Sequence, residues 1–187
     1  APPGLTMLSV SDDAIKAMEN RKTPIASFYC NILTFKNYYK DKWFPYTMPI
    51  SDIIGLNKAI SNVLHDKTIL KRHHIIGQAV RKAVTAAGLT LYAKGGYSDT
   101  VSVINVPEGL TDTQILDTMR DDYNILIAGC FDILAGKVFR IGHMGENANI
   151  RDVAETLSAL DKTFKKLNYH LNCSMADVFI DEINKFE

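Results

Sequence analysis

The chain has 187 residues, of which 47% are hydrophobic and 22% are charged, so its composition is that of an ordinary globular protein. Lysine plus arginine and aspartate plus glutamate number 21 each, and the resulting net charge of zero argues against nucleic acid or an anionic membrane as the main partner. No apolar run approaches the roughly 18 residues of a membrane span. The three widely spaced cysteines indicate reduced thiols and a cytoplasmic location, with neither a disulfide framework nor a metal site.

The first part of the chain combines a short apolar run with an aromatic-rich stretch. Residues 5–10 are predicted to form a short buried strand, and residues 13–21 a short helix. Aromatic side chains are frequent in residues 23–49 but follow no period, and prolines interrupt them. Such a stretch packs either against a large surface, such as another subunit, or over the core of its own chain.

Two helices are predicted next. Apolar residues at helical spacing indicate one helix from about residue 50 to residue 64 and a second over 67–87, which Gly88 ends. The second helix contains the adjacent histidines His73 and His74. Neighbouring helix positions point in different directions, so the two side chains cannot bind one metal ion together. We expect both to be surface or packing residues.

After Gly88 the apolar residues alternate, which is typical of strands. The predicted strands cover residues 89–93, 101–106, 125–128 and 138–141. Helices are predicted to begin after Thr111, which starts a capping box, and after Asn149. The order predicts an α+β fold, with a small, mostly antiparallel sheet that has helices on one face and follows a long helical arm. Residues 171–187 add a further amphipathic segment.

One arginine stands out in the run Lys137-Val138-Phe139-Arg140-Ile141-Gly142-His143-Met144-Gly145. Arg140 lies within an apolar, strand-like segment, and an unpaired buried charge is costly, so it needs an anionic partner. Its planar guanidinium suits a carboxylate or a phosphate held by two parallel hydrogen bonds. By spacing alone, an ion pair with a surface carboxylate at a strand end is the more common explanation.

A series of short motifs runs along nearly all of residues 1–170. They are Ala1-Pro2-Pro3-Gly4, Arg21-Lys22-Thr23 with Ser27-Phe28-Tyr29, Pro45-Tyr46-Thr47-Met48-Pro49, Ile127-Ala128-Gly129, and Ala135-Gly136-Lys137 leading into the run that contains Arg140. In this order and spacing they resemble the C-terminal part of the class V, fold-type I pyridoxal-phosphate aminotransferases. The alanine–glyoxylate and serine–pyruvate aminotransferase group is the most similar.

The resemblance implies a homodimeric enzyme that transfers an amino group from a small amino acid, of the alanine or serine type, to a 2-oxo acid such as glyoxylate or pyruvate. It divides the chain into the tail end of the large domain with an interface segment (1–49), connecting helices (50–88), a small domain (89–170) and a helical extension (171–187). In the family, the lysine that forms the Schiff base with pyridoxal phosphate precedes the Ala-Pro-Pro-Gly motif. No catalytic residue is therefore expected in this chain, which alone is expected to be inactive.

Four residues acquire site roles by their positions in the motifs. Arg140 would bind the substrate carboxylate, and Gly129 would leave the substrate pocket open. Thr47 would reach the cofactor phosphate of the neighbouring subunit, and Tyr46 is a weaker candidate for the same place. Helix capping is the alternative for Thr47 and packing for Tyr46. His143 is expected to be a hydrogen-bonded histidine behind the predicted strand that contains Arg140.

One segment departs from the family pattern. Family members often have further glycines after Ile-Ala-Gly, where this chain has Cys130-Phe131-Asp132. Because this loop is close to the expected substrate site, the sequence does not identify the substrate. Arg140 would suit any α-amino acid, and a class V lyase or desulfurase therefore stays an alternative. A further alternative is a non-catalytic binding or dimerisation domain.

Overall fold

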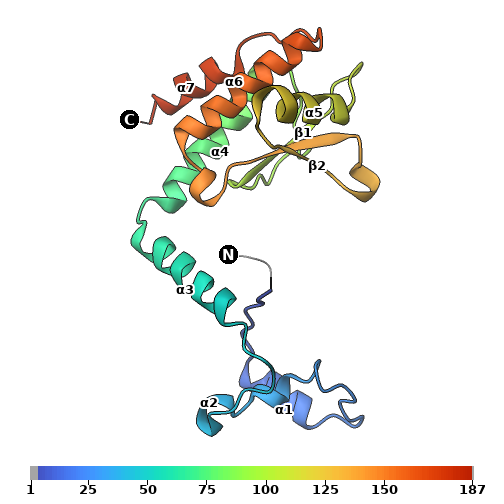
Figure 1. Cartoon of the computed structure of the whole chain (residues 1–187), viewed down its shortest axis with the longest axis vertical. Helices are drawn as coiled ribbons and strands as arrows, with labels where there is room; N and C mark the ends of the chain where they lie inside the picture. Colours follow the sequence, from blue (N-terminus) through green and yellow to red (C-terminus); the bar gives the residue numbers. More distant parts are fainter. Residues whose placement is uncertain (1–3, 187) are drawn as a thin grey trace. The chain divides into compact units, whose positions relative to one another are not determined.

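The structure, a computed structural model, describes residues 4–186, so that only Gly4 of the Ala1-Pro2-Pro3-Gly4 motif is included. The chain divides between Asp66 and Lys67 into two units, each with its own set of helices (Figure 1). None of the helices in the described range is both long enough and apolar enough to cross a membrane.

The first unit is mainly helical. Its elements are α1 (Asp12–Glu19), η1 (Ile32–Phe35), α2 (Tyr38–Asp41) and α3 (Ile50–His65). Ser11 caps α1, because its hydroxyl accepts a hydrogen bond from the Ala14 amide over 3.2 Å. The helices predicted over 13–21 and 50–64 are thereby confirmed within a few residues.

The strand predicted for residues 5–10 is wrong. The segment has no regular structure, and Met7 and Leu8 are 77% and 68% exposed. A strand needs a hydrogen-bonded neighbour as well as apolar side chains. All strands within residues 4–186 belong to one sheet that begins at Val101, in the second unit.

The first unit contains an aromatic cluster around Tyr46. The Tyr46 ring stacks on Tyr29 with centroids 5.1 Å apart, and its edge contacts with Phe28 and Phe44 have centroid distances of 5.5 Å and 6.2 Å. Even so, no residue of the described segment 4–66 is buried. The aromatic contacts are therefore local, and this unit has no core of its own.

The second unit is the α+β part of the chain. Its elements are α4 (Ile69–Ala86), β1 (Val101–Asn105), α5 (Asp112–Tyr123), β2 (Ala128–Gly129), η2 (Asp132–Leu134), β3 (Val138–Gly142), η3 (Gly145–Asn147), α6 (Ile150–Lys166) and α7 (Met175–Ile183). The capping box of Thr111 with Gln114 and the cap of Asn149 on the Asp152 amide are both formed, as predicted. Gly88, with a φ of 91°, follows the end of α4. The strand predicted for 89–93 is reduced to one bridge between Leu91 and Ile104.

The sheet has three strands in the order β1-β3-β2, and both pairings are antiparallel. Side chains alternate across it, so Phe139 and Ile141 of β3 face the helices together with Ile104 of β1. Helices α4 to α7 supply the rest of this core on the same face (Figure 1). The C-terminal helix α7 packs against α4 and α6 and buries Met175 and Phe179. The predicted α+β architecture is therefore confirmed.

Candidate functional site

Arg140 lies in β3, the central strand of the sheet. Its neighbours across the two pairings are Val103 of β1 and Ala128 of β2. Because strand side chains alternate, Arg140 points to the face opposite that of Phe139 and Ile141, which are buried in the core. The arginine is half-buried on this second face of the sheet.

The guanidinium of Arg140 is fixed at one point. Its Nε donates a hydrogen bond to the carbonyl oxygen of Gly129 over 2.9 Å. Within residues 4–186 its two terminal nitrogens form no hydrogen bond, and no carboxylate forms an ion pair with it. The surface ion pair that spacing alone favours is therefore not formed in the described part of the chain, and the outer edge of the fork is available to an anion.

Gly129 is the last residue of the edge strand β2. A Cβ atom there would lie 3.3 Å from Leu116 Cδ1 and 3.4 Å from Asp112 Oδ2, both on α5. The absence of a side chain thus permits the close approach of α5, on the core face of the sheet, while the carbonyl group holds Arg140. After Gly129 the chain enters a loop in which Phe131 and Ile133 are 85% and 73% exposed.

Behind the arginine strand, His143 is completely buried. Its Nδ1 donates to the Asp99 carbonyl oxygen over 3.0 Å, and its Nε2 lies 2.9 Å from the Ser102 hydroxyl. Burial lowers the pKa of His143 below its usual 6.5, and the nearby charge of Arg81 acts in the same direction, while the hydrogen bond to the Asp99 carbonyl acts against them. The neutral imidazole is therefore a hydrogen-bonded packing residue, in agreement with the expectation.

Sequence reasoning missed Ser102 and Asp99. A signal existed for Ser102, since it alternates with Ile104 on the core face of β1, and a polar residue at such a position needs a buried partner. No comparable signal existed for Asp99. Its carboxylate accepts hydrogen bonds from Arg81 over 3.0 Å and pairs with His74 at 2.9 Å.

The two adjacent histidines of α4 have different surroundings. His74 is bonded to Asp99 and to the Gln78 side chain, while His73 is nearly buried and bonded to the Gly145 amide. No group of three or more His, Cys, Asp and Glu side chains suitable for a metal ion occurs between residues 4 and 186. Both histidines have the packing and surface roles expected of them.

Thr47 and Tyr46 lie in the first unit and line a cavity of about 770 Å³. The Tyr46 hydroxyl points to the carbonyl oxygens of Phe28 and Tyr29, at 3.1 Å and 3.3 Å, so its proton is directed to the main chain. Thr47 is exposed and, in the described range, forms no hydrogen bond and does not cap α3, whose N-cap is Pro49. Of the two, Thr47 therefore has a hydroxyl available to a phosphate oxygen.

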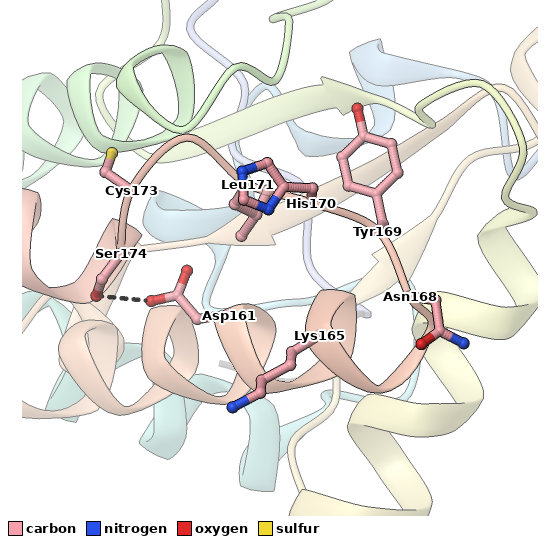
Figure 2. A pocket seen from close by; sticks show the side chains of 8 residues that line it. All are labelled: Asp161, Lys165, Asn168, Tyr169, His170, Leu171, Cys173 and Ser174. Atoms are coloured by element: carbon pink, nitrogen blue, oxygen red, sulfur yellow. Dashed lines mark hydrogen bonds between the residues drawn. The ribbon is translucent and has the colours of Figure 1, made fainter.

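A second cavity, of about 490 Å³, lies between the end of α6 and the loop that leads into α7 (Figure 2). Figure 2 shows Asp161 turned toward Ser174 at the start of α7. The Asp161 carboxylate accepts hydrogen bonds from the Ser174 hydroxyl and from the amides of Met175 and Ala176, at 3.0 to 3.2 Å. None of the residues given a site role by the sequence lines this cavity, and Asp161 is explained by its cap on α7.

Several known proteins similar to this chain are named as aminotransferases, and two others, 31% and 26% identical to it, are named as soluble hydrogenase subunits of Synechococcus and Anabaena cylindrica. No protein-family model matches the sequence. An uncharacterized aminotransferase of Methanocaldococcus jannaschii is 35% identical over 182 residues, which are 95% of this chain and 47% of that protein. The L-aspartate–glyoxylate aminotransferase of Paracoccus denitrificans is 38% identical over 148 residues, or 77% of this chain and 37% of the relative.

A solved structure agrees with these relatives. The pyridoxamine–pyruvate aminotransferase of Mesorhizobium loti superposes on all of this chain with a TM-score of 0.91 and 29% sequence identity. The superposition covers 49% of that protein. The chain therefore spans about half the length, or less, of the proteins that it matches.

Proposed function

We propose that the chain is the C-terminal part of a class V aminotransferase and so forms part of an enzyme that moves an amino group from a small amino acid to a 2-oxo acid; the proposal is supported by relatives named as aminotransferases, of which the chain spans about half or less. The donor is of the alanine or serine type, and the acceptor is of the glyoxylate or pyruvate type. Support for an acceptor of this kind comes from the names of the similar proteins, which include glyoxylate and pyruvate.

The observation that carries the proposal is the state of Arg140. Its Nε is held by the Gly129 carbonyl, whereas its terminal nitrogens have no partner among residues 4–186. A guanidinium fixed in this way presents two parallel donors in one orientation, which is the geometry that a carboxylate accepts. Arg140 would bind the carboxylate of the donor and then that of the acceptor, since both substrates have this group.

Aminotransferases generally use pyridoxal phosphate, and we propose this cofactor here. When bound, it supplies the carbonyl group and the electron sink for the transfer. The exposed hydroxyl of Thr47 fits a phosphate oxygen, and we assign Thr47 rather than Tyr46 to that contact in a homodimer. No lysine of this chain is assigned to the Schiff base, because the family motif places that lysine before Ala1.

The test is the kinetics of the whole enzyme with Arg140→Ala. Loss of a charge-assisted hydrogen-bonded pair costs about 1.5–3 kcal/mol, so KM for the amino acid is expected to rise about 10-fold or more. The matched control is Arg151→Ala, because the Arg151 side chain is 90% exposed and, among residues 4–186, is bonded only to its neighbour Asp152. Arg151→Ala should leave KM unchanged.

Two outcomes would contradict the proposal. If Arg140→Ala has the kinetics of the wild type, Arg140 does not bind the substrate carboxylate. If product forms from the amino acid without any 2-oxo acid acceptor, the enzyme is a lyase or desulfurase of the same family rather than an aminotransferase.

A further inference from the structure

His73 connects α4 to the turn that follows the arginine strand. Its Nε2 accepts a hydrogen bond from the Gly145 amide over 3.0 Å, and its Nδ1 lies 2.7 Å from the Ile69 carbonyl oxygen. An amide nitrogen can only donate and a carbonyl oxygen can only accept. The proton of a neutral His73 is therefore on Nδ1, and both ring nitrogens are satisfied in a side chain that is 9% exposed.

The turn held by His73 contains Met144. Gly142 lies two residues beyond Arg140 in β3, so the two share one face of the sheet, about 6.6 Å apart along the strand. A Cβ atom on Gly142 would point at the terminal methyl of Met144, 4.0 Å away. The Met144 methyl therefore lies at van der Waals distance from the position of a Cβ on Gly142, on the same face as Arg140.

A second histidine holds the same segment from the other side. His143 is bonded through its ring to the Asp99 carbonyl and to Ser102, and its own amide donates to the Thr100 carbonyl over 2.9 Å. The segment from Gly142 to Gly145 is therefore tied to the core at two successive points. Met144, between them, is the residue whose side chain is left at the surface, with 50% exposure.

We propose that His73 is a positioning residue for the Arg140 site, and that Met144 forms an apolar side of that site. By holding the Gly145 amide, His73 keeps the Met144 side chain beside Gly142, on the face of β3 that carries Arg140. An apolar neighbour lowers the local dielectric and strengthens the attraction between a guanidinium and a carboxylate. The part of this inference that concerns substrate rests on the proposed function; the part that concerns the turn does not.

The first experiment measures amide hydrogen exchange in the 187-residue chain by NMR. In His73→Leu the Gly145 amide loses its acceptor, and its exchange rate is expected to rise about tenfold, as for the loss of one hydrogen bond. In His73→Gln the side-chain oxygen can still accept, so the rate should return close to that of the wild type. The matched control is His74→Gln, since His74 is on the same helix but its ring nitrogens are bonded to Asp99 and Gln78 instead of to Gly145.

Exchange at Ile104 and Ile141, in the core of the sheet, serves as the measure of global opening. If Gly145 exchanges at the same rate in His73→Leu as in the wild type, the positioning role is overturned. If Ile104 and Ile141 accelerate as much as Gly145 does, the effect is one of overall stability, and the proposal is likewise overturned.

The second experiment separates KM from kcat in the whole enzyme. His73→Leu and Met144→Ala are both expected to raise KM for the amino acid about fivefold or more with kcat nearly unchanged, because both weaken carboxylate binding. His73→Gln should restore KM. A loss of folded protein alone would lower kcat at constant KM, and that result would overturn the role. If the wild type transfers no amino group at all, the proposed function fails, while the exchange result at Gly145 still tests the turn.

Discussion

The burial of His143, which follows strand β3, leads to a testable prediction about how the stability of the chain depends on pH. His143 is completely buried and both of its ring nitrogens are hydrogen-bonded. Burial lowers its pKa in the folded chain, whereas in the unfolded chain the group returns to about 6.5. The informative change is His143→Gln, which removes the titrating group and retains a polar side chain.

The sign follows from proton binding. Above about pH 6.5 His143 is neutral in both states, and it adds no pH dependence. Between about 6.5 and the lower pKa of the folded chain, only the unfolded chain binds the proton, so acid favours unfolding. Over that interval the wild-type free energy of unfolding should fall by up to about 1.4 kcal/mol per pH unit because of this one group. Below the folded pKa the contribution becomes constant.

At neutral pH the variant loses one of the two ring hydrogen bonds, and we expect it to be about 1–3 kcal/mol less stable than the wild type. As the pH falls below about 6.5, the gap between the two proteins should narrow, since the variant lacks this proton uptake. The other four histidines are present in both proteins, so their titration largely cancels in the difference.

Urea unfolding followed by far-UV circular dichroism is the appropriate assay. The single tryptophan, Trp43, belongs to the first unit, so its fluorescence does not report on the unit that contains His143. Helices α4 to α7 supply the far-UV signal of that second unit. A gap between wild type and His143→Gln that stays constant from about pH 7.5 to about pH 5 would refute the reasoning, because it would mean that His143 has the same pKa in the folded and unfolded chains.

Two further changes test the core and the end of α4. Leu157→Ala removes a fully buried side chain of α6 and should lower the free energy of unfolding by about 2–5 kcal/mol, whereas Leu126→Ala, at a position 81% exposed, should change it by less than about 0.5 kcal/mol in the same urea titration. Gly88→Ala forces a Cβ atom to within 2.8 Å of Asn172 Nδ2 at a φ of 91°, and should cost about 1–2 kcal/mol. Gly95→Ala, whose Cβ would meet nothing within 4 Å, is its control, and equal thermal midpoints for the two glycine variants would contradict the argument.

The helices and their caps could be predicted from the sequence because their signals are local. Apolar residues three and four apart fix the buried face of a helix, and a capping residue such as Thr111 or Asn149 acts within one turn. The strands were predicted less well. Residues 89–93 have the alternation of a strand but form only the bridge from Leu91 to Ile104, because pairing depends on a partner far along the chain.

In the candidate site, too, local structure could be predicted from the sequence, whereas contacts between distant residues could not. That Arg140 would lie in a strand followed from its neighbours, and the structure confirms the strand. Its bond to the Gly129 carbonyl joins residues eleven positions apart, and the bond of His73 to Gly145 joins residues 72 positions apart. Such contacts depend on the register of the sheet and on the position of α4, neither of which is encoded in a local pattern.

Helix α3 shows what periodicity establishes and what it does not. Its apolar residues follow the helical spacing, and the helix forms, yet Ile54 and Leu64 are 64% and 74% exposed and no residue of α3 is buried. Helical spacing tells which side chains share a face, whereas burial also requires a complementary surface. Marginal helices draw most of their stability from such packing. The spacing of α3 therefore predicts the helix, but it does not predict which surface the apolar face of the helix packs against.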